Sequence, residues 1–237
     1  MKVKISDKVI AAYSTRQDGN MSLCYGDTSK ALSERKKFLA DLGIDYSKLV
    51  GAQQTHSKNV AYVTEADLGK GALLYDSAIA DTDAFITDKP GIPLAVFTAD
   101  CLSVFLYDPV KNAIAMVHAG WRGTQKGIAS AALDCMRNRF KTNPADLIAY
   151  FGPCIRSCCF EVEADFKKYF PNKVIERDKR LFLDIPAVNA EQLTHAGVKP
   201  GDISDCGFCT VSQNDRFFSF RKEADKAGRL ISVIMLR

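Results

Sequence analysis

Two apolar runs in the middle of the chain, separated by a short polar turn, constrain the fold more than any other feature. The runs are residues 102–107 and 113–118, and residues 108–112 form the turn. Apolar runs of this length around a turn with proline and asparagine predict a β-hairpin. Because a hairpin joins antiparallel strands, it argues against a purely parallel, doubly wound sheet. We therefore expect an α/β (α+β) fold with mixed sheets.

The rest of the apolar pattern alternates between helical and strand periodicity. Helices are predicted over residues 29–42, 124–140, 162–170 and 187–195, and strands near residues 9–12, 59–63, 84–86, 94–98, 147–151 and 230–236. With 237 residues and 47% hydrophobic content, the chain can bury one sizeable core. No linker or internal repeat divides it, so residues 1–237 are expected to form a single domain.

Charge and hydropathy exclude several classes of protein. The net charge is only +4, and no basic block indicates a nucleic-acid partner. The largest basic cluster, residues 177–180, is expected to cap a solvated loop. No apolar stretch approaches the roughly 20 residues that span a bilayer, and residues 1–7 lack a signal-peptide core. A cytoplasmic protein with no membrane partner is therefore expected.

The hairpin brings a cysteine and a histidine to its open end. If its turn is centred between Pro109 and Val110, antiparallel pairing places Cys101 opposite His118 and Ser103 opposite Met116. A Cys–His pair supports two chemistries. The imidazole can activate the thiol as a nucleophile, or both side chains can ligate zinc or copper.

Only two other histidines occur in the chain. His56 precedes a strand-like run, so it is the candidate third ligand; His195 falls at an expected helix C-terminus and is interpreted as structural. His56, Cys101 and His118 would then leave one metal position open, as catalytic sites do.

The eight cysteines are interpreted as thiols or ligands, because cytosolic proteins rarely form disulfides. A rival four-thiolate zinc site could use Cys154, Cys158 and Cys159 together with Cys206 and Cys209. Their spacing is irregular and the gap between the two groups is long, so we favour buried cysteines that pack as small apolar residues.

The run His118-Ala119-Gly120-Trp121-Arg122-Gly123 adds a candidate anion site. If a helix begins near Gly123 and Thr124, its free backbone N–H groups and the Arg122 guanidinium could hold phosphate beside the metal. Alternatively, Arg122 binds carbonyls within the turn. Trp121 is expected to fill the core.

Several motifs, taken in order, resemble the laccase-domain family, also called the multicopper polyphenol oxidoreductase family. They are Asp83-Ala84-Phe85-Ile86-Thr87, Thr98-Ala99-Asp100-Cys101, His118-Ala119-Gly120-Trp121-Arg122-Gly123, Gly152-Pro153-Cys154-Ile155 with Glu161-Val162, and Phe218-Ser219-Phe220-Arg221 with Gly228-Arg229. The resemblance spans nearly the whole chain. Two departures occur: Leu102-Ser103 follows the motif cysteine where many members have Leu-Pro or Val-Pro, and Lys222 stands where many have a second arginine.

The resemblance implies a layered α-β-β-α sandwich with His56, Cys101 and His118 as metal ligands. It also implies purine nucleoside phosphorylase activity together with adenosine deaminase activity. Arg221 and Arg229 are then candidates for binding substrate or phosphate, as are Arg122 and Arg16, which lies in an early turn. Lys222 is left out because lysine cannot reproduce the bidentate binding of an anion by a guanidinium.

Motifs of other enzymes are absent. No histidine is followed by Glu two residues later, as in the usual zinc deaminases, and there is no Walker, Rossmann or Gly-x-Ser-x-Gly motif. Three histidines are also too few for a multicopper oxidase. The leading hypothesis is therefore a zinc-dependent phosphorylase acting on adenosine, inosine, guanosine or methylthioadenosine, with adenosine deaminase activity.

Two alternatives stay open. A cysteine hydrolase or amidase could edit an amino-acyl or peptidoglycan-precursor bond, with Cys101 as the nucleophile and His118 as the base. The chain could instead be a copper-binding polyphenol oxidoreductase or a non-enzymatic metal-binding protein, since copper competes well for such donors. The oligomeric state is not predicted.

Overall fold

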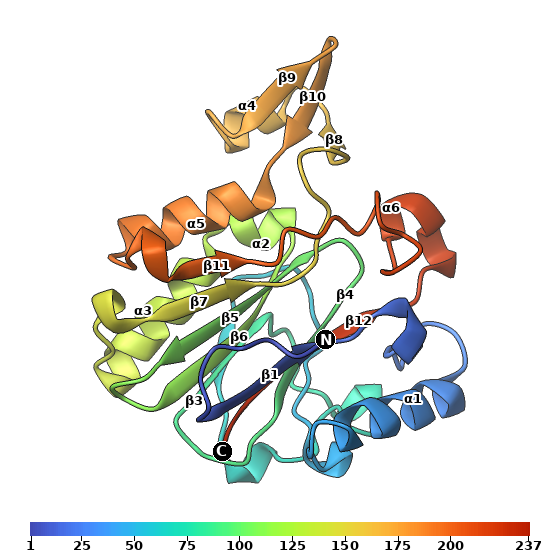
Figure 1. Cartoon of the computed structure of the whole chain (residues 1–237), viewed down its shortest axis with the longest axis vertical. Coiled ribbons are helices and arrows are strands. Elements are labelled where there is room, and N and C mark those ends of the chain that lie inside the picture. The colour runs from blue at the N-terminus through green and yellow to red at the C-terminus, as the bar shows by residue number, and fades with distance from the viewer.

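The protein is built from four layers in which two β-sheets lie face to face between helices (Figure 1). This computed structural model describes all of residues 1–237. The larger sheet has six strands in the order β11 (Ile203–Asp205), β7 (Ile148–Phe151), β5 (Leu102–Asp108), β6 (Ala113–Ala119), β3 (Ala84–Thr87) and β2 (Val60–Tyr62). Its β2–β3 and β7–β11 pairs are parallel and the others antiparallel, which confirms the expected mixed sheet.

A smaller antiparallel sheet packs against one face of the larger one. Its strand order is β1 (Val9–Tyr13), β12 (Leu230–Leu236) and β4 (Leu94–Thr98). Between the sheets lies an apolar core that includes Phe85, Phe105, Met116, Val96 and Leu230. The outer layers are α1 (Thr28–Ala40) over the smaller sheet and α3 (Ile128–Phe140) with α5 (Ile185–His195) over the larger one. The expected α-β-β-α sandwich is therefore confirmed.

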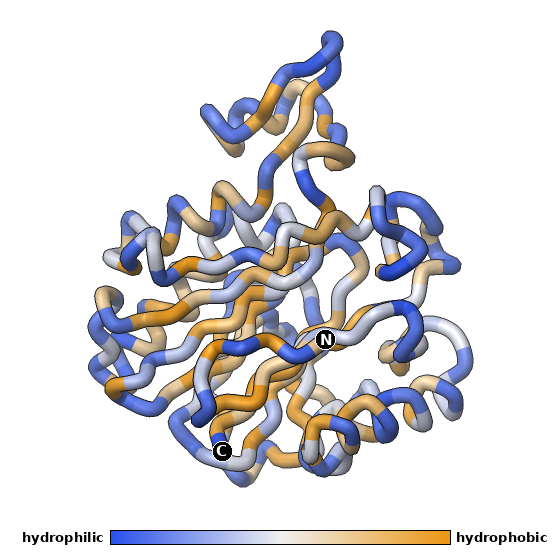
Figure 2. The backbone as a smooth tube through the Cα atoms, viewed as in Figure 1, coloured by the Kyte–Doolittle hydropathy of each residue, from blue (hydrophilic) through white to orange (hydrophobic).

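Strand β6 shows why the sequence requires helices on one side of the larger sheet and a second sheet on the other. Its side chains alternate between the two cores, with Ile114 and Met116 facing the smaller sheet and Ala115 and Val117 facing the helices. Both faces of the strand are buried. Figure 2 shows that apolar residues are concentrated along the central strands.

The hairpin exists, but its register is not the expected one. The turn is centred one residue later, between Val110 and Lys111, so Ser103 pairs with His118 and Phe105 with Met116. The Asp108 carboxylate fixes this turn by accepting the N–H groups of Val110 and Lys111, each at 2.9 Å. The expected pairing of Cys101 with His118 is therefore wrong by two residues.

The helix expected over residues 124–140 is divided in two. A five-residue helix, α2 (Trp121–Gln125), ends before Gly127, and α3 begins at Ile128. Gly127 has a φ of 76°, in the left-handed region that glycine adopts at little cost, and this breaks the helix. The buried face of α3 includes Ile128, Leu133 and Met136, so its apolar spacing was interpreted correctly.

A third, three-stranded sheet projects from the body (Figure 1). It contains β8 (Glu161–Val162), β10 (Arg180–Leu183) and β9 (Val174–Arg177), with the short α4 (Phe166–Tyr169) beside them. A helix was expected over residues 162–170, but only α4 is helical there. Strands β9 and β10 were not predicted; the basic cluster at 177–180 spans the turn between them.

None of the helices combines the length and apolar character that crossing a bilayer requires. The last, α6 (Phe220–Glu223), lies in the loop-rich region before β12.

Candidate functional site

His118 comes from the last part of β6 and points toward the inter-sheet side. It shares a strand face with Met116 and lies opposite Ser103, so the alternation of the strand carries it to the end of the inter-sheet core. The imidazole is buried, with 2% of the residue exposed. Its Nδ1 lies 2.7 Å from the Asp83 carboxylate, which leaves Nε2 as the atom available to a ligand.

Asp83 is hydrogen-bonded to both histidines of the site, and the sequence analysis gave it no role. It is fully buried immediately before β3. Besides holding His118, its carboxylate accepts the backbone N–H of His56 at 3.1 Å and both the N–H and Oγ–H of Ser57 at 2.7 Å. Burial would raise the pKa of this carboxyl, but the hydrogen bonds and charge of His118 and the donors of Ser57 outweigh it, so the pKa is well below its ordinary value.

These hydrogen bonds hold His56 in an unusual backbone conformation. Its φ is 59°, in the left-handed region that non-glycine residues seldom adopt. The Asp83 carboxylate accepts hydrogen bonds from the N–H groups of His56 and Ser57, which flank the Cα of His56, and these bonds offset the strain. As a result, the His56 ring lies edge-on to the His118 ring, with 4.9 Å between the ring centroids.

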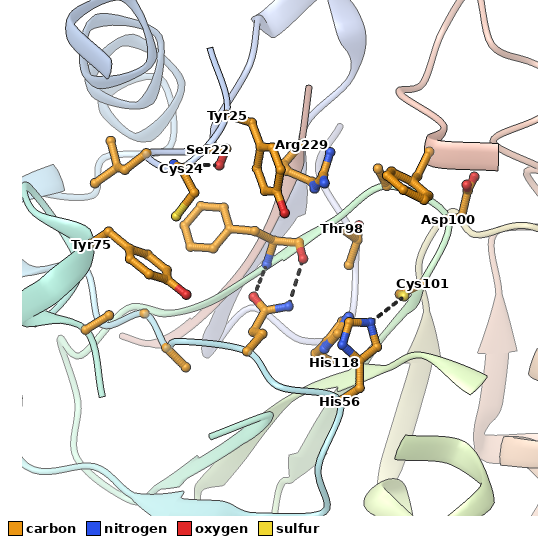
Figure 3. A pocket seen from close by; sticks show the side chains of 18 of the residues that line it. Ser22, Cys24, Tyr25, His56, Tyr75, Thr98, Asp100, Cys101, His118 and Arg229 are labelled. Atoms are coloured by element: carbon orange, nitrogen blue, oxygen red, sulfur yellow. Dashed lines mark hydrogen bonds between the residues drawn. The ribbon is translucent and has the colours of Figure 1, made fainter. Parts of the chain in front are cut away.

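Cys101 approaches the two histidines from the turn between β4 and β5. Its Sγ lies 3.7 Å from Nε2 of His56 (Figure 3). Burial raises the pKa of the thiol, but the charges and hydrogen bonds of His118 and His56 outweigh burial and lower it to about 6. Burial likewise lowers the pKa of His118, while the Cys101 charge and the Asp83 hydrogen bond raise it to about 9. Each of these two shifts favours the charged form of its group in the presence of the other.

The structure therefore brings together the three residues that the sequence analysis selected. Their ligand atoms all lie within 4.8 Å of one another. A tetrahedral zinc ion at ordinary bond lengths would separate a sulfur and a nitrogen ligand by about 3.6 Å, close to the observed Cys101–His56 distance. A Cβ added to Gly120 would lie 2.7 Å from His56 and 2.9 Å from Cys101, so only glycine leaves room beside these donors. With Asp83 behind His118, the residues fit a metal with one open position.

A cavity of about 540 Å³ opens in front of this cluster. That volume is in the range of small-molecule sites. The lining includes the three candidate ligands, four guanidinium groups and several aromatic rings, among them Arg35, Arg122, Arg221, Arg229, Tyr25, Tyr75, Phe97 and Phe220. In Figure 3, Tyr25 and Tyr75 lie on the opposite side of the cavity from the histidines, and Arg229 lies behind Tyr25. Sequence analysis missed these rings, because isolated tyrosines in loops carry no periodic signal.

The arginines at the cavity are held in different ways. Arg35 is buried and donates to the backbone carbonyls of Met21, Gly71 and Ala72. Arg221 donates from Nη1 to the Glu161 carbonyl at 3.1 Å, and its own N–H donates to Asp100 at 2.6 Å. Arg229 stacks on Tyr25 with 3.8 Å between the guanidinium carbon and the ring centroid. Arg122 stacks on Trp121 at 4.4 Å. Stacking of this kind leaves guanidinium N–H groups available to an anion.

Arg16 lies apart from the cavity. Its Nη2 forms a 2.7 Å ion pair with Glu223, and its Nε donates to the Asn214 carbonyl at 2.8 Å. The structure therefore does not bring Arg16 together with the other three candidate arginines.

The anion site expected at a helix N-terminus near Gly123 and Thr124 does not form there. The helix begins at Trp121, and the N–H of Thr124 is already bonded to the Gly120 carbonyl at 2.8 Å. Gly123 and Thr124 are both buried inside α2. Of the residues proposed for that anion site, only Arg122 lines the cavity. Trp121 is half-buried against the helical core and contacts Phe166, as expected of a packing residue, but it also lines the cavity.

Comparison with known proteins assigns the family. Residues 10–237 match the family model described as multi-copper polyphenol oxidoreductase laccase. The chain belongs to this laccase family. The purine nucleoside phosphorylase YlmD of Bacillus subtilis is 32% identical over 97% of this chain and 89% of its own length. Adenosine deaminase RL5, from an unknown prokaryotic organism, is 34% identical over 88% of this chain and 82% of its own.

Solved structures of this laccase family share the fold. The crystal structure of the Bacillus licheniformis hypothetical protein YfiH superposes with a TM-score of 0.95 at 33% sequence identity, covering 100% of this chain and 96% of that one. The family resemblance and the fold expected from the sequence are thereby confirmed. Relatives named as enzymes support an enzyme here too.

Proposed function

We propose that this protein is a zinc-dependent purine nucleoside phosphorylase that also deaminates adenosine. The observation that carries the proposal is a donor set of His56, Cys101 and His118 exposed to a cavity that also presents guanidinium groups and aromatic rings. Metal-type donors and anion-binding groups in one cavity suit a substrate that must meet both phosphate and an activated water. The names of the relatives provide the substrate class.

Deamination would use the donor cluster. A zinc ion bound there would act as a Lewis acid that activates water for attack at C6 of adenosine, from which ammonia leaves. The protein contributes by holding the ligand side chains in position. Asp83 fixes the orientation of His118 and, through the backbone of residue 56, that of His56. The Cys101 thiol is already ionised near neutral pH, since its pKa is about 6.

Phosphorolysis would use the arginine side of the cavity. A phosphate oxygen forms a bond to C1′ of the ribose as the bond from C1′ to N9 breaks, and the purine leaves with a proton. Arg122, Arg221 and Arg229 are proposed to hold the phosphate and offset its charge. The rings of Tyr25 and Tyr75 offer flat apolar surfaces for the base. Adenosine, inosine, guanosine and methylthioadenosine all carry such a base.

Mass analysis of products from a nucleoside panel tests this function. Zinc-loaded protein is incubated with each nucleoside, with and without phosphate. We expect free purine and the corresponding pentose 1-phosphate only when phosphate is present, and conversion of adenosine to inosine without it. Equal base release with and without phosphate would rule out phosphorolysis, and full turnover by chelator-treated protein would rule out the zinc mechanism. Copper-loaded protein, assayed in parallel, tests the alternative metal.

The Cys101–His56 contact also favours a second candidate function, a cysteine hydrolase. A thiol with a lowered pKa, 3.7 Å from an imidazole, has the geometry of an activated nucleophile. In that case the Cys101 thiolate would attack the carbonyl of an amide or ester, the C–N or C–O bond would break, and the amine or alcohol would leave with a proton. The thioester left on Cys101 would be detected by intact-mass analysis. The same measurement on the phosphorylase would show no adduct.

A further inference from the structure

A second group of metal-capable side chains lies outside the cavity. The thiols of Cys158, Cys159 and Cys209 approach so closely that their sulfur atoms all lie within 4.8 Å of one another. Two of these sulfurs, those of Cys158 and Cys159, are 3.5 Å apart. All three cysteines are free thiols, and none of them lines the cavity.

Two segments distant in sequence form this cluster. Cys158 and Cys159 lie in the turn that follows β7 and precedes β8, and Cys209 lies in the loop after β11. The segments run side by side through a parallel bridge between Cys154 and Cys209. The N–H of Thr210 donates to the Cys154 carbonyl at 3.0 Å. Cys154 and Cys206 do not join the cluster, so the four-thiolate arrangement considered from the sequence does not form.

The three thiols differ in how far they are buried. Cys158 is exposed, Cys159 is partly buried and Cys209 is buried. A bound cation would offset the charge of three thiolates this close together.

The two segments also hold the turn that presents Cys101 to the cavity. Thr210, next to Cys209, donates its hydroxyl to Asp100 Oδ1 at 2.6 Å. From the other segment, the N–H of Ile155 donates to the Asp100 carbonyl at 2.8 Å. The remaining oxygen of the Asp100 carboxylate accepts the N–H of Arg221. Whatever fastens the two segments therefore also fixes Asp100, which has a φ of 90°, and with it the position of Cys101.

We propose that Cys158, Cys159 and Cys209 form a second metal site, which binds a thiophilic cation, Zn²⁺ or Cu⁺, and fastens the two segments behind Asp100. At metal–sulfur bonds of about 2.3 Å, ligands in a tetrahedral or trigonal site lie about 3.8–4.0 Å apart, so small side-chain movements suffice. Each ligand releases its proton on binding, and no sulfur is oxidised. Because Cys158 is exposed, solvent can reach the ion and complete its coordination.

Metal stoichiometry tests this site without reference to any enzyme activity. Reduced, metal-free protein is dialysed against Zn²⁺ and, in a separate anaerobic experiment, against Cu⁺, and bound metal per chain is measured. We expect two ions in the wild type with at least one of the metals. We expect one ion in Cys101→Ala, one in Cys209→Ser and none in the double variant. A wild type that binds a single ion, lost entirely in Cys101→Ala, would overturn the proposal.

Further variants guard against misfolding and against oxidation. Cys158→Ser alters an exposed side chain, so it should fold, and it should weaken binding at the second site by at least about 100-fold, more than the loss of an outer-shell partner costs. Cys135→Ser, on α3 and outside the cluster, is the matched control and should still bind two ions. A disulfide between Cys209 and either neighbour in untreated protein, with no second ion bound after reduction, would also refute the metal site.

Discussion

The two sides of the cavity are built differently. On the metal-ligand side, His118 in β6 and Asp83 directly before β3 are buried, Asp83 also holds the backbone of His56, and Cys101 directly precedes β5. The arginine side, Arg122, Arg221 and Arg229 with the aromatic rings, is carried by two short helices and loops. Groups tied to the central strands or to a buried carboxylate keep their geometry without ligand, whereas groups on short helices and loops can adjust. We therefore expect the first side to set the rate of the reaction and the second to set substrate affinity.

The largest effect is expected on the metal-ligand side. Cys101→Ala removes a ligand, and because a bound metal contributes several kcal/mol to the barrier, kcat for both reactions should fall by about 1000-fold or more. Steady-state kinetics with zinc-loaded protein measures this. Cys135→Ser serves as the control and should keep wild-type rates. Retention of more than a tenth of the activity in Cys101→Ala would mean that the thiol is not a ligand.

Asp83→Asn separates the positioning of a ligand from ligation itself. The amide keeps the shape of the side chain but cannot accept all of the N–H groups that the carboxylate accepts, so zinc affinity should fall about 10–100-fold. Competition with a chelator measures the affinity. Because Asp83 acts through His118, saturating zinc should restore most of kcat. A kcat that stays low in excess zinc would show that Asp83 has a direct part in the chemistry.

On the arginine side the effect should appear in KM. Arg122→Ala removes one charge-assisted contact, so KM for phosphate should rise about 10-fold with kcat nearly unchanged. Arg16→Ala is the informative comparison. Its guanidinium is paired with Glu223 away from the cavity, so it should lower stability and leave KM for phosphate within about twofold. A larger rise in KM for Arg16→Ala would place this arginine at the phosphate after all.

The smallest effect concerns pH and the loop that carries Arg221. Glu223 ends α6 and accepts hydrogen bonds from Arg16, Asn214 and the N–H of Ser219. Burial raises the pKa of its carboxyl, but these partners outweigh burial and lower it. A lowered pKa means that the carboxylate stabilises the fold fully above its ordinary pKa of about 4.3, and that this contribution is lost as pH falls through the folded-state value.

Thermal unfolding between about pH 6 and pH 3 measures that contribution. The wild type should lose more stability than Glu223→Gln over this range, by about 2 °C in Tm or less, because ion pairs that remain partly exposed to solvent contribute little. Parallel curves for the two proteins would show that Glu223 does not respond to acid as proposed.

The hairpin shows how much the sequence could predict and where counting residues fails. Its strands and its polar turn follow from the pattern, but the turn centre depends on how Asp108 binds the turn N–H groups, which periodicity does not reveal. The error moved each pairing by two residues. Because strand side chains alternate with period two, His118 still faces the expected side, and the approach of Cys101 and His56 survives the error.

Other features left little signal in a single sequence. Asp83 begins one of the motifs that resemble the family, but only the contacts made on folding identify its partners and its role. The hairpin of β9 and β10 projects from the body, so its charged residues obscure the alternation expected of a half-buried strand. Gly127 sits within an otherwise helical pattern, where one glycine indicates a break only weakly.

Strand β12 carries a consequence for how the protein is made. It lies between β1 and β4 and pairs with both. Those two strands are synthesised first, so they cannot form this sheet until residues 230–236 have been made. Arg229 directly precedes this strand, and Cys101 follows β4. On the ribosome, a nascent chain could complete its β5–β6 hairpin early, yet the cavity would take shape only after residue 236 emerges. Chains that lack β12 would expose the apolar surface between the sheets and would be prone to aggregate. We therefore expect chaperones to matter most before β12 has paired.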